Sequence, residues 1–137
     1  MRRIVERLDE KGLASSVNAE WTIAGVLGHI AFWDERARRL AERLHSGGKF
    51  SPADEEPEDV DWINDAARPL IHAIPPRALA ELALRIAEET DSTVERLPDE
   101  ALPKLWPADP HSPLNPTRAG HRGEHLDQIE KALASRS

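Results

Sequence analysis

Cysteine is missing from this 137-residue chain, and its absence excludes several kinds of chemistry. A chain without thiols forms no disulfides, builds no cysteine-ligated metal site and has no cysteine nucleophile. Any metal ion must therefore be held by histidine or carboxylate groups, and any thiol in the chemistry must come from another molecule. By elimination, a cytoplasmic location is expected.

The sequence also lacks an excess of basic residues and any long apolar run. Its formal net charge of −7 argues against nucleic acid as a general partner, because binding to phosphates needs a basic face. The apolar runs are only a few residues long, so no membrane span is expected. Residues 1–7 meet acidic side chains at once and have no apolar core, which predicts that there is no secretion signal.

The chain does have a globular composition with helical periodicity. Hydrophobic residues make up 39% and charged residues 31%, which is typical of a folded chain rather than a disordered one. The length suits one domain, which we expect to span residues 1–137. Apolar side chains recur with a period of about 3.6 residues and strict alternation is weak, so the predicted class is all-α.

Four main helices are predicted in an up-down bundle, with a short extra helix or turn in the loops and no sheet. Asn18 and Thr22 are both suitable N-caps for the second helix, and Gly47 and Gly48 end it. In the third helix five apolar side chains are spaced to be buried: Val60, Ile63, Ala67, Leu70 and Ile71. The predicted helices span about residues 3–14, 19–46 or 23–46, 59–74, 76–97 and 116–134.

Two connecting stretches stand out by composition. Residues 54–61 carry six acidic side chains, a pattern typical of a solvated surface. Residues 98–116 hold six of the eleven prolines. A loop of that length in a small domain is either functional or a cover, and we expect it, with Trp106, to roof part of a binding pocket.

A pair of histidines in the last predicted helix has the spacing of metal ligands. His121 and His125 are four residues apart, so they lie on one helical face about 6 Å apart along the axis. Their imidazoles can converge on one ion, which is why this spacing recurs in metal sites. The alternative is that they are two polar residues flanking a helix face.

A tight metal site needs a third ligand, and His29 is the strongest candidate. It lies inside the apolar stretch 26–33 and faces inward on its helix. Alternatively, it is a core histidine hydrogen-bonded to a carbonyl group. The remaining histidines are expected at the surface, as is usual for histidines away from apolar stripes: His45, His72 and His111.

The same helix also matches a peptidase signature. His121, Glu124 and His125 fit a His-x-x-Glu-His motif in which Glu124 would be the general base. Such enzymes need a third ligand well downstream, and only twelve residues follow His125. The peptidase hypothesis is therefore disfavoured.

Two segments resemble the DinB-like superfamily. Residues 21–34 are similar to its second helix, which carries Trp, then Ser or Thr, then Leu-x-His-Leu/Ile; here the sequence is WTIAGVLGHIAFWD. Residues 121–130, HRGEHLDQIE, resemble its closing helix, and residues 61–64, DWIN, resemble a Trp/Asn patch before its third long helix. The resemblance covers about residues 15–134, and the first helix is shorter here than is usual in the family.

This resemblance implies a four-helix bundle that binds a divalent ion, usually nickel or zinc. The implied ligands are His29, His121 and His125, with water completing the shell. Characterised relatives transfer or isomerise substrates with a low-molecular-weight thiol, such as bacillithiol or mycothiol, while many others have no known activity. Fold alone therefore does not decide function.

Three functional hypotheses remain. The first is an enzyme whose metal binds a small-molecule thiol that attacks an electrophile, because a site with three protein ligands leaves positions open for chemistry. Trp33, Asp34 and Asn64 are then candidates for lining the cofactor pocket, and no catalytic base is evident. The second is a non-catalytic metal-binding stress or ligand-binding protein. The third is an interaction module, since a short first helix leaves an apolar strip that a second copy could cover in a homodimer.

Overall fold

The structure, a computed structural model, describes residues 1–50 and 60–136. In these residues every regular element is a helix: α1 (Arg2–Arg7), α2 (Glu10–Leu13), α3 (Ile23–His45), α5 (Val60–His72), α6 (Pro76–Glu95), the 3-10 helix η1 (Asp99–Lys104) and α7 (Arg118–Ala134). Pairing of extended backbone in these ranges is limited to one isolated bridge between Ser16 and Thr22. The predicted all-α class is confirmed.

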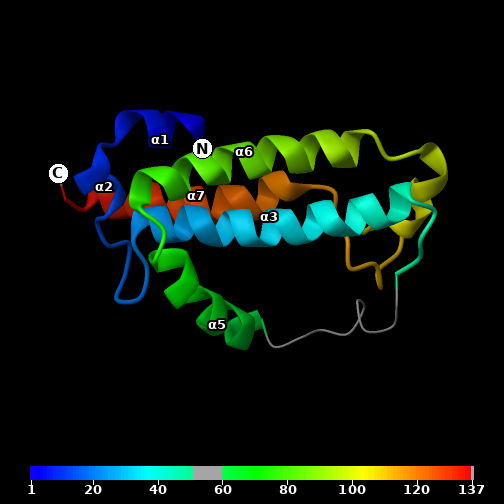
Figure 1. The fold of residues 1–137 in the computed structure, drawn as a ribbon, viewed down its shortest axis with the longest axis horizontal. Helices are drawn as coiled ribbons and strands as arrows, with labels where there is room; N and C mark the ends of the chain where they lie inside the picture. Colours follow the sequence, from blue (N-terminus) through cyan, green and yellow to red (C-terminus); the bar gives the residue numbers. More distant parts are fainter. Residues whose placement is uncertain (51–59, 137) are drawn as a thin grey trace.

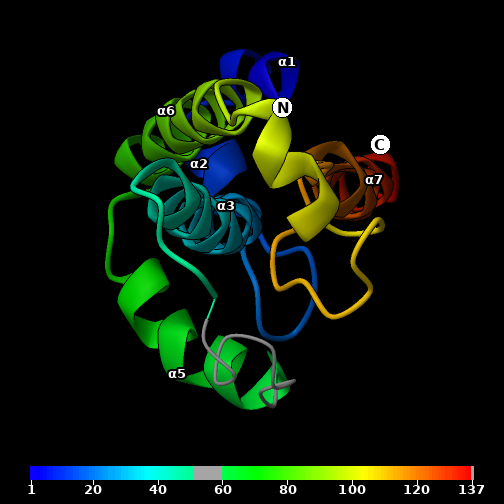
Figure 2. The same ribbon diagram turned by 90° about the vertical axis from the view of Figure 1, so that its right-hand side faces the viewer.

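The four main helices alternate in direction along the chain (Figure 1). Helices α3 and α6 run parallel, side by side, while α7 runs antiparallel to α3 (Figure 2). Helix α5 runs obliquely to the other three and meets α3 mainly near its own C-terminal end. None of the helices in the two described ranges is both long enough and apolar enough to cross a membrane.

The N-terminal segment differs from the single helix expected over residues 3–14. Leu8 is extended, with φ −97° and ψ 136°, and ends α1. Asp9 then caps α2 by accepting a hydrogen bond from the Gly12 amide. Because the chain bends at this point, both short helices bury apolar residues, namely Ile4, Val5 and Leu13.

Helix α3 is the central element of the fold. Of the two predicted caps, Thr22 is the one used, because its side chain accepts a hydrogen bond from the Gly25 amide. Gly47 follows the helix with φ +74°, a left-handed conformation that glycine adopts without strain. Nearly every residue in the first third of α3 is buried, so the helix contacts neighbours on several sides.

The close approach of α5 to α3 depends on Gly28. A Cβ atom there would lie 2.6 Å from Ile71 Cγ2 and 2.8 Å from Leu79 Cδ1, so the missing side chain leaves room for both neighbours. Ile71 is accordingly buried, as predicted.

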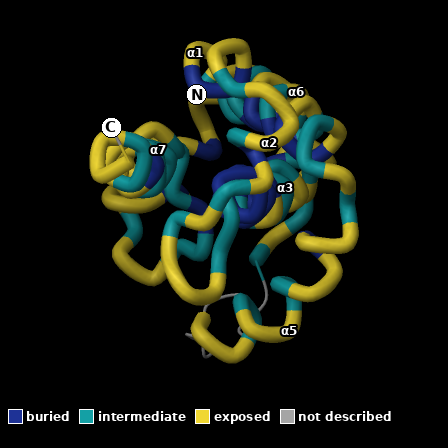
Figure 3. Tube along the Cα trace, turned by 90° about the vertical axis from the view of Figure 1, so that its left-hand side faces the viewer, coloured by how far each residue is buried: buried dark blue, intermediate teal, exposed yellow. Residues whose placement is uncertain are grey.

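The prediction that the other four apolar side chains of α5 are buried is wrong. Val60 is 50% exposed and Leu70 73% exposed, while Ile63 and Ala67 are half-buried. The 3.6-residue spacing is present, but the oblique helix buries only Ile71 of its last turn, while Ala67 packs partly against the core. Figure 3 shows exposed and intermediate residues along most of α5.

The core is divided between the two ends of α3. One cluster joins the first half of α3 to α1, α2, α6 and Ile129 of α7, and the other joins its second half to the segment after α6. In that second cluster Leu97, Ala101, Leu105 and Leu114 are buried. The proline-rich segment 98–116 therefore closes the far end of the bundle and buries apolar side chains of its own.

One further boundary differs from the sequence prediction. Helix α7 begins at Arg118 rather than at residue 116, because Asn115 first accepts a hydrogen bond from the Thr117 amide in a turn. Of the acidic stretch, residues 54–59 lie outside the described residues, and Asp61 is exposed on α5.

The neighbouring side chains Ile71 and Leu70 provide a test of how α5 packs. In dilute, monomeric protein we expect Ile71→Ala to lower the free energy of unfolding by about 2–4 kcal/mol, because it removes a buried side chain. Leu70→Ala is the matched control and should change it by no more than about 0.5 kcal/mol. Chemical denaturation measures both values. Equal effects would contradict the burial of Ile71 against α3.

Candidate metal centre

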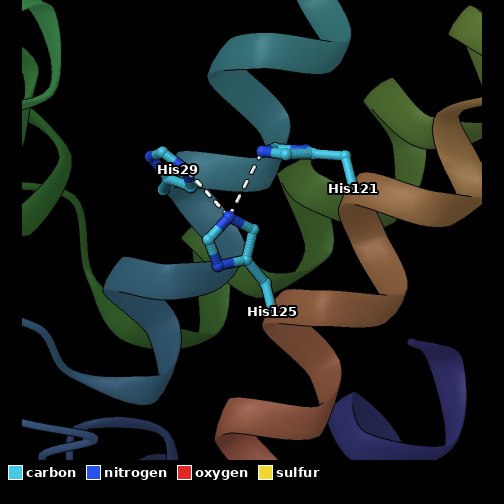
Figure 4. A group of neighbouring side chains, drawn as sticks. All are labelled: His29, His121 and His125. Atoms are coloured by element: carbon cyan, nitrogen blue, oxygen red, sulfur yellow. Dashed lines mark hydrogen bonds between the residues drawn. The ribbon is translucent and has the colours of Figure 1, made fainter. Parts of the chain in front are cut away.

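Three histidine rings converge between α3 and α7 (Figure 4). The distance between His29 Nε2 and His125 Nε2 is 3.1 Å, and that between His125 Nε2 and His121 Nε2 is 3.2 Å. One nitrogen from each ring lies within 4.8 Å of the others. His29 is buried and the other two are half-buried, so the cluster lies at the edge of the core. The convergence expected from the sequence is present.

A buried network of ion pairs fixes how α7 is turned toward α3. Arg118 Nε donates to Asp34 Oδ1 at 2.9 Å, and Arg122 Nε donates to Asp34 Oδ2 at 2.8 Å. Arg122 also donates both of its terminal nitrogens to the Asp91 carboxylate on α6 at 2.9 Å. Each arginine lies three residues before a histidine of the cluster. The network therefore sets the rotation of α7 that aims both rings at His29.

Asp34 belongs to this network rather than to a pocket wall. Its side chain is 0% exposed, and both of its oxygens accept from arginines whose side chains are 12% and 13% exposed. Its backbone carbonyl also accepts a hydrogen bond from Thr90 Oγ1 on α6. The residue therefore joins α3 to both α6 and α7.

The nitrogen spacing fits a common metal ion. Bonds of about 2.0–2.1 Å that meet at a tetrahedral angle separate ligand nitrogens by about 3.3–3.4 Å, and bonds at right angles separate them by about 2.8–3.0 Å. The two measured separations lie between these values. His29, His121 and His125 thus suit a divalent ion without selecting tetrahedral over octahedral geometry.

The outer nitrogens of two of the rings have different neighbours. His125 Nδ1 lies 3.0 Å from Gln128 Oε1, an acceptor that keeps the proton on Nδ1 and leaves Nε2 free to ligate. His121 Nδ1 lies 3.4 Å from Arg118 Nη2, which can only donate. Ligation through His121 Nε2 would move the ring proton to Nδ1, so Arg118 would have to give up this contact.

Burial keeps two of the rings neutral, which is the form that binds metal. Desolvation, with smaller contributions from His125 and His121, lowers the pKa of His29 from 6.5 to about 4. Desolvation, with contributions from His125, Arg118 and Arg122, lowers the pKa of His121 to about 4 as well. Both rings should therefore be unprotonated over the physiological pH range.

A pocket of about 220 Å³ leads to His29 and His125. Its other lining residues come from the loop before α3, from α3 itself, from α5 and from α7: Asn18, Glu20, Trp21, Val26, Asn64 and Gln128. The segment 98–116 is not among the lining residues, so the expectation that it roofs the pocket is wrong. That segment packs instead against the far end of α3.

The three predicted pocket residues have different positions. Asn64 lines the pocket. Trp33 does not line it but holds Asn64, because its indole Nε1 donates to Asn64 Oδ1 at 2.9 Å. Asp34 is buried in the ion-pair network.

Several residues of the site were not found from the sequence. Trp21 contacts His29 with ring centroids 5.6 Å apart, and Gln128 orients His125. Arg118 and Arg122 have the same four-residue spacing as the histidine pair. Asp34 is an acidic residue on the apolar face of α3, where it needs a basic partner. Reading those two signals together would have predicted the ion pairs.

The all-α fold and the three-histidine cluster define the class of a DinB-like helical protein. The chain belongs to the family described as the mycothiol maleylpyruvate isomerase N-terminal domain, whose model matches residues 1–123, and this family is part of the DinB-like superfamily. The match includes His29 and His121 and ends two residues before His125. No curated protein and no solved structure matches the chain significantly.

The lowered pKa values of His29 and His121 predict a loss of stability in acid. Above pH 6.5 both rings are neutral whether the chain is folded or unfolded, so they add no pH dependence. Between pH 6.5 and about 4 the unfolded chain binds protons that the folded protein does not. The free energy of unfolding therefore decreases as the pH is lowered through this range. Thermal unfolding of metal-free protein across this range measures the slope.

A variant without one of the rings checks the cause of that slope. His29→Gln should make the dependence on pH shallower, because one of the two depressed groups is gone. His111→Gln, which removes an exposed histidine from the proline-rich segment, should titrate like the unsubstituted protein. Identical slopes for all three proteins would contradict the assignment.

Proposed function

We propose that this protein binds one divalent ion, nickel or zinc, through His29, His121 and His125, and uses it to bind a low-molecular-weight thiol for an isomerase or transferase reaction. The observation that carries the proposal is the convergence of three ring nitrogens, two pairs of them 3.1 and 3.2 Å apart, beside a pocket that His29 and His125 line. The family name supports mycothiol as the thiol and an isomerase as the reaction.

The chemistry follows from the charge of the ligands. Three neutral imidazoles leave the double positive charge of the ion uncompensated, and a bound ion of this kind holds a thiol as its thiolate at neutral pH. The chain has no cysteine, so the thiol must be a cofactor or a substrate. An electrophile that enters the pocket would then meet a thiolate beside His29 and His125. We further propose a cytoplasmic location, where such thiols are kept reduced.

The surrounding residues would position this chemistry. Trp21 would form the apolar wall against His29. Asn64 would hydrogen-bond the ligand, and the Trp33 indole would hold the Asn64 side chain in place. Asp34 would act at a distance, by orienting α7 through Arg118. None of these groups is placed as a general base.

Two alternatives are less well supported. A non-catalytic ion that only braces the bundle needs no access, whereas here a pocket reaches two of the three histidines. A peptidase would use Glu124 as its base, but Glu124 is exposed and does not line that pocket. Access from solvent favours the reaction with a small molecule.

Metal titration tests the first half of the proposal. Zn²⁺ or Ni²⁺ should raise the melting temperature of the protein, because an ion that binds only the folded state stabilises it. His121→Ala should remove most of this shift, and His45→Ala, a histidine outside the cluster, should keep it.

The second half is tested with mycothiol and a model electrophile. The metal-loaded protein should speed their conjugation above the rate seen with the metal-free protein and with His121→Ala. If the ion binds but no thiol binds and no rate increases, the protein is a metal-binding protein rather than a transferase or isomerase.

A homodimer is a second proposal, and the face that supports it is not the one expected. The short N-terminal helices bury their apolar residues, whereas two adjoining apolar grooves of about 420 and 360 Å³ lie over α3, α5 and α6. Both grooves are lined by Phe32 and Ile71, and Trp62 and Leu70, which are 70% and 73% exposed, line the second one. Exposed apolar side chains and grooves on the same face suit an isologous contact, in which the exposed side chains of each copy occupy the grooves of the other.

Light scattering tests the dimer. At micromolar concentration the protein should have the mass of two chains, and Leu70→Glu should return it to one, because a charge would be buried in the interface. Leu102→Glu, at an exposed leucine beyond the grooves, is the matched control. A monomer mass for the unsubstituted protein would exclude this interface.

A further inference from the structure

The three amide side chains of the histidine pocket all have their oxygen atoms occupied by the protein. Trp33 Nε1 can only donate, so the 2.9 Å contact fixes Oδ1 of Asn64 toward the indole. Asn18 Oδ1 accepts from the backbone amides of Glu20 and Trp21, both at 2.9 Å. Each amide therefore has its NH₂ group left for other partners.

Gln128 follows the same pattern once His125 acts as a ligand. Ligation through Nε2 leaves the proton on Nδ1, which donates to Gln128 Oε1 at 3.0 Å. In the described ranges no hydrogen bond occupies the amide nitrogens of Asn64 or Gln128. The two side chains lie on α5 and α7, so they border the histidines from two different elements.

The remaining polar group of the pocket is already paired. The Glu20 carboxylate accepts from Arg68 Nη1 at 3.4 Å, and Arg68 also lies over the Trp21 ring at 5.6 Å. Trp21 and Val26 add apolar surface. The amide groups left for a ligand are thus donors, and a donor left unpaired on ligand binding is costly.

We infer that Asn64 and Gln128 select the ligand by donating to its oxygen atoms, so that the pocket favours a small thiol with a carboxylate or carbonyl oxygen a few bonds from its sulfur. This inference rests on the proposed function, because it assumes that the thiol binds at the three histidines. The two amides are positioning residues, and the expected effect is a preference between thiols rather than a loss of metal.

Four thiols that differ only in the group attached to the sulfur-bearing carbon test the preference. Mercaptoacetate and methyl mercaptoacetate carry acceptor oxygens, ethanethiol carries none, and cysteamine carries a donor. With the cobalt-loaded protein the thiolate absorption band gives each dissociation constant. We expect the two oxygen-bearing thiols to bind at least about tenfold more tightly than ethanethiol, relative to their thiolate fractions, and cysteamine to show no gain.

Isosteric variants separate the amides from chelation by the metal. Asn64→Asp and Gln128→Glu keep the acceptor for Trp33 and for His125 but remove the donor, so each should abolish most of the preference, including that for the neutral ester. Asn115→Asp adds the same charge on the proline-rich segment and should preserve the preference. A preference that survives both pocket variants, or thiols that bind the unsubstituted protein without any preference, overturns the inference.

Acetate binding separates a failure of the amide inference from a failure of the proposed function. Calorimetry should show that metal-loaded protein binds acetate more tightly than either pocket variant does, whether or not thiols bind. Absence of every thiolate band would overturn the proposed function alone, whereas equal acetate affinity in all the proteins would overturn the amide inference.

Discussion

The carboxylate of Asp34 is the group on which the arrangement of the site depends. It has no exposed surface and its two oxygens accept from two arginines of α7. Ile129 is the only buried residue of that helix, and Leu126 and Leu133 pack against the core beside it. A buried charge is tolerable only when it is paired and hydrogen-bonded, so losing both arginines would leave an uncompensated charge that costs about 3–5 kcal/mol. The pairing therefore restricts α7 to one rotation.

That rotation has a direct consequence for the histidines. Since Arg118 and Arg122 face Asp34, the side chains three residues later, His121 and His125, face His29 five residues earlier on α3. The same arginines add positive charge beside His121, which helps to keep its pKa low and its ring neutral. Structural ion pairs and a metal-binding cluster thus lie side by side on the same two helices.

The outer parts of the pocket depend on weaker elements. Asn64 comes from α5, which contacts the bundle mainly through its last turn, and Asn18 comes from the loop before α3. Asn64 is held by a hydrogen bond from the Trp33 indole, and Asn18 by hydrogen bonds from two backbone amides. The histidines and Gln128 are therefore set on α3 and α7, which the Asp34 ion pairs join, while Asn64 lies on a helix with one buried residue.

The sequence determined the all-α class, the extent of α3, and two histidines on one face of α7, because these depend on local periodicity and capping. It also placed His29 inside an apolar helix. Only the tertiary structure decided that Asp34 pairs with arginines instead of lining a pocket, that Leu70 is exposed, and that the proline-rich segment closes the opposite end. Helical spacing specifies which residues share a face, whereas the neighbour of that face depends on how helices cross, and here Gly28 and the Asp34 ion pairs set those crossings.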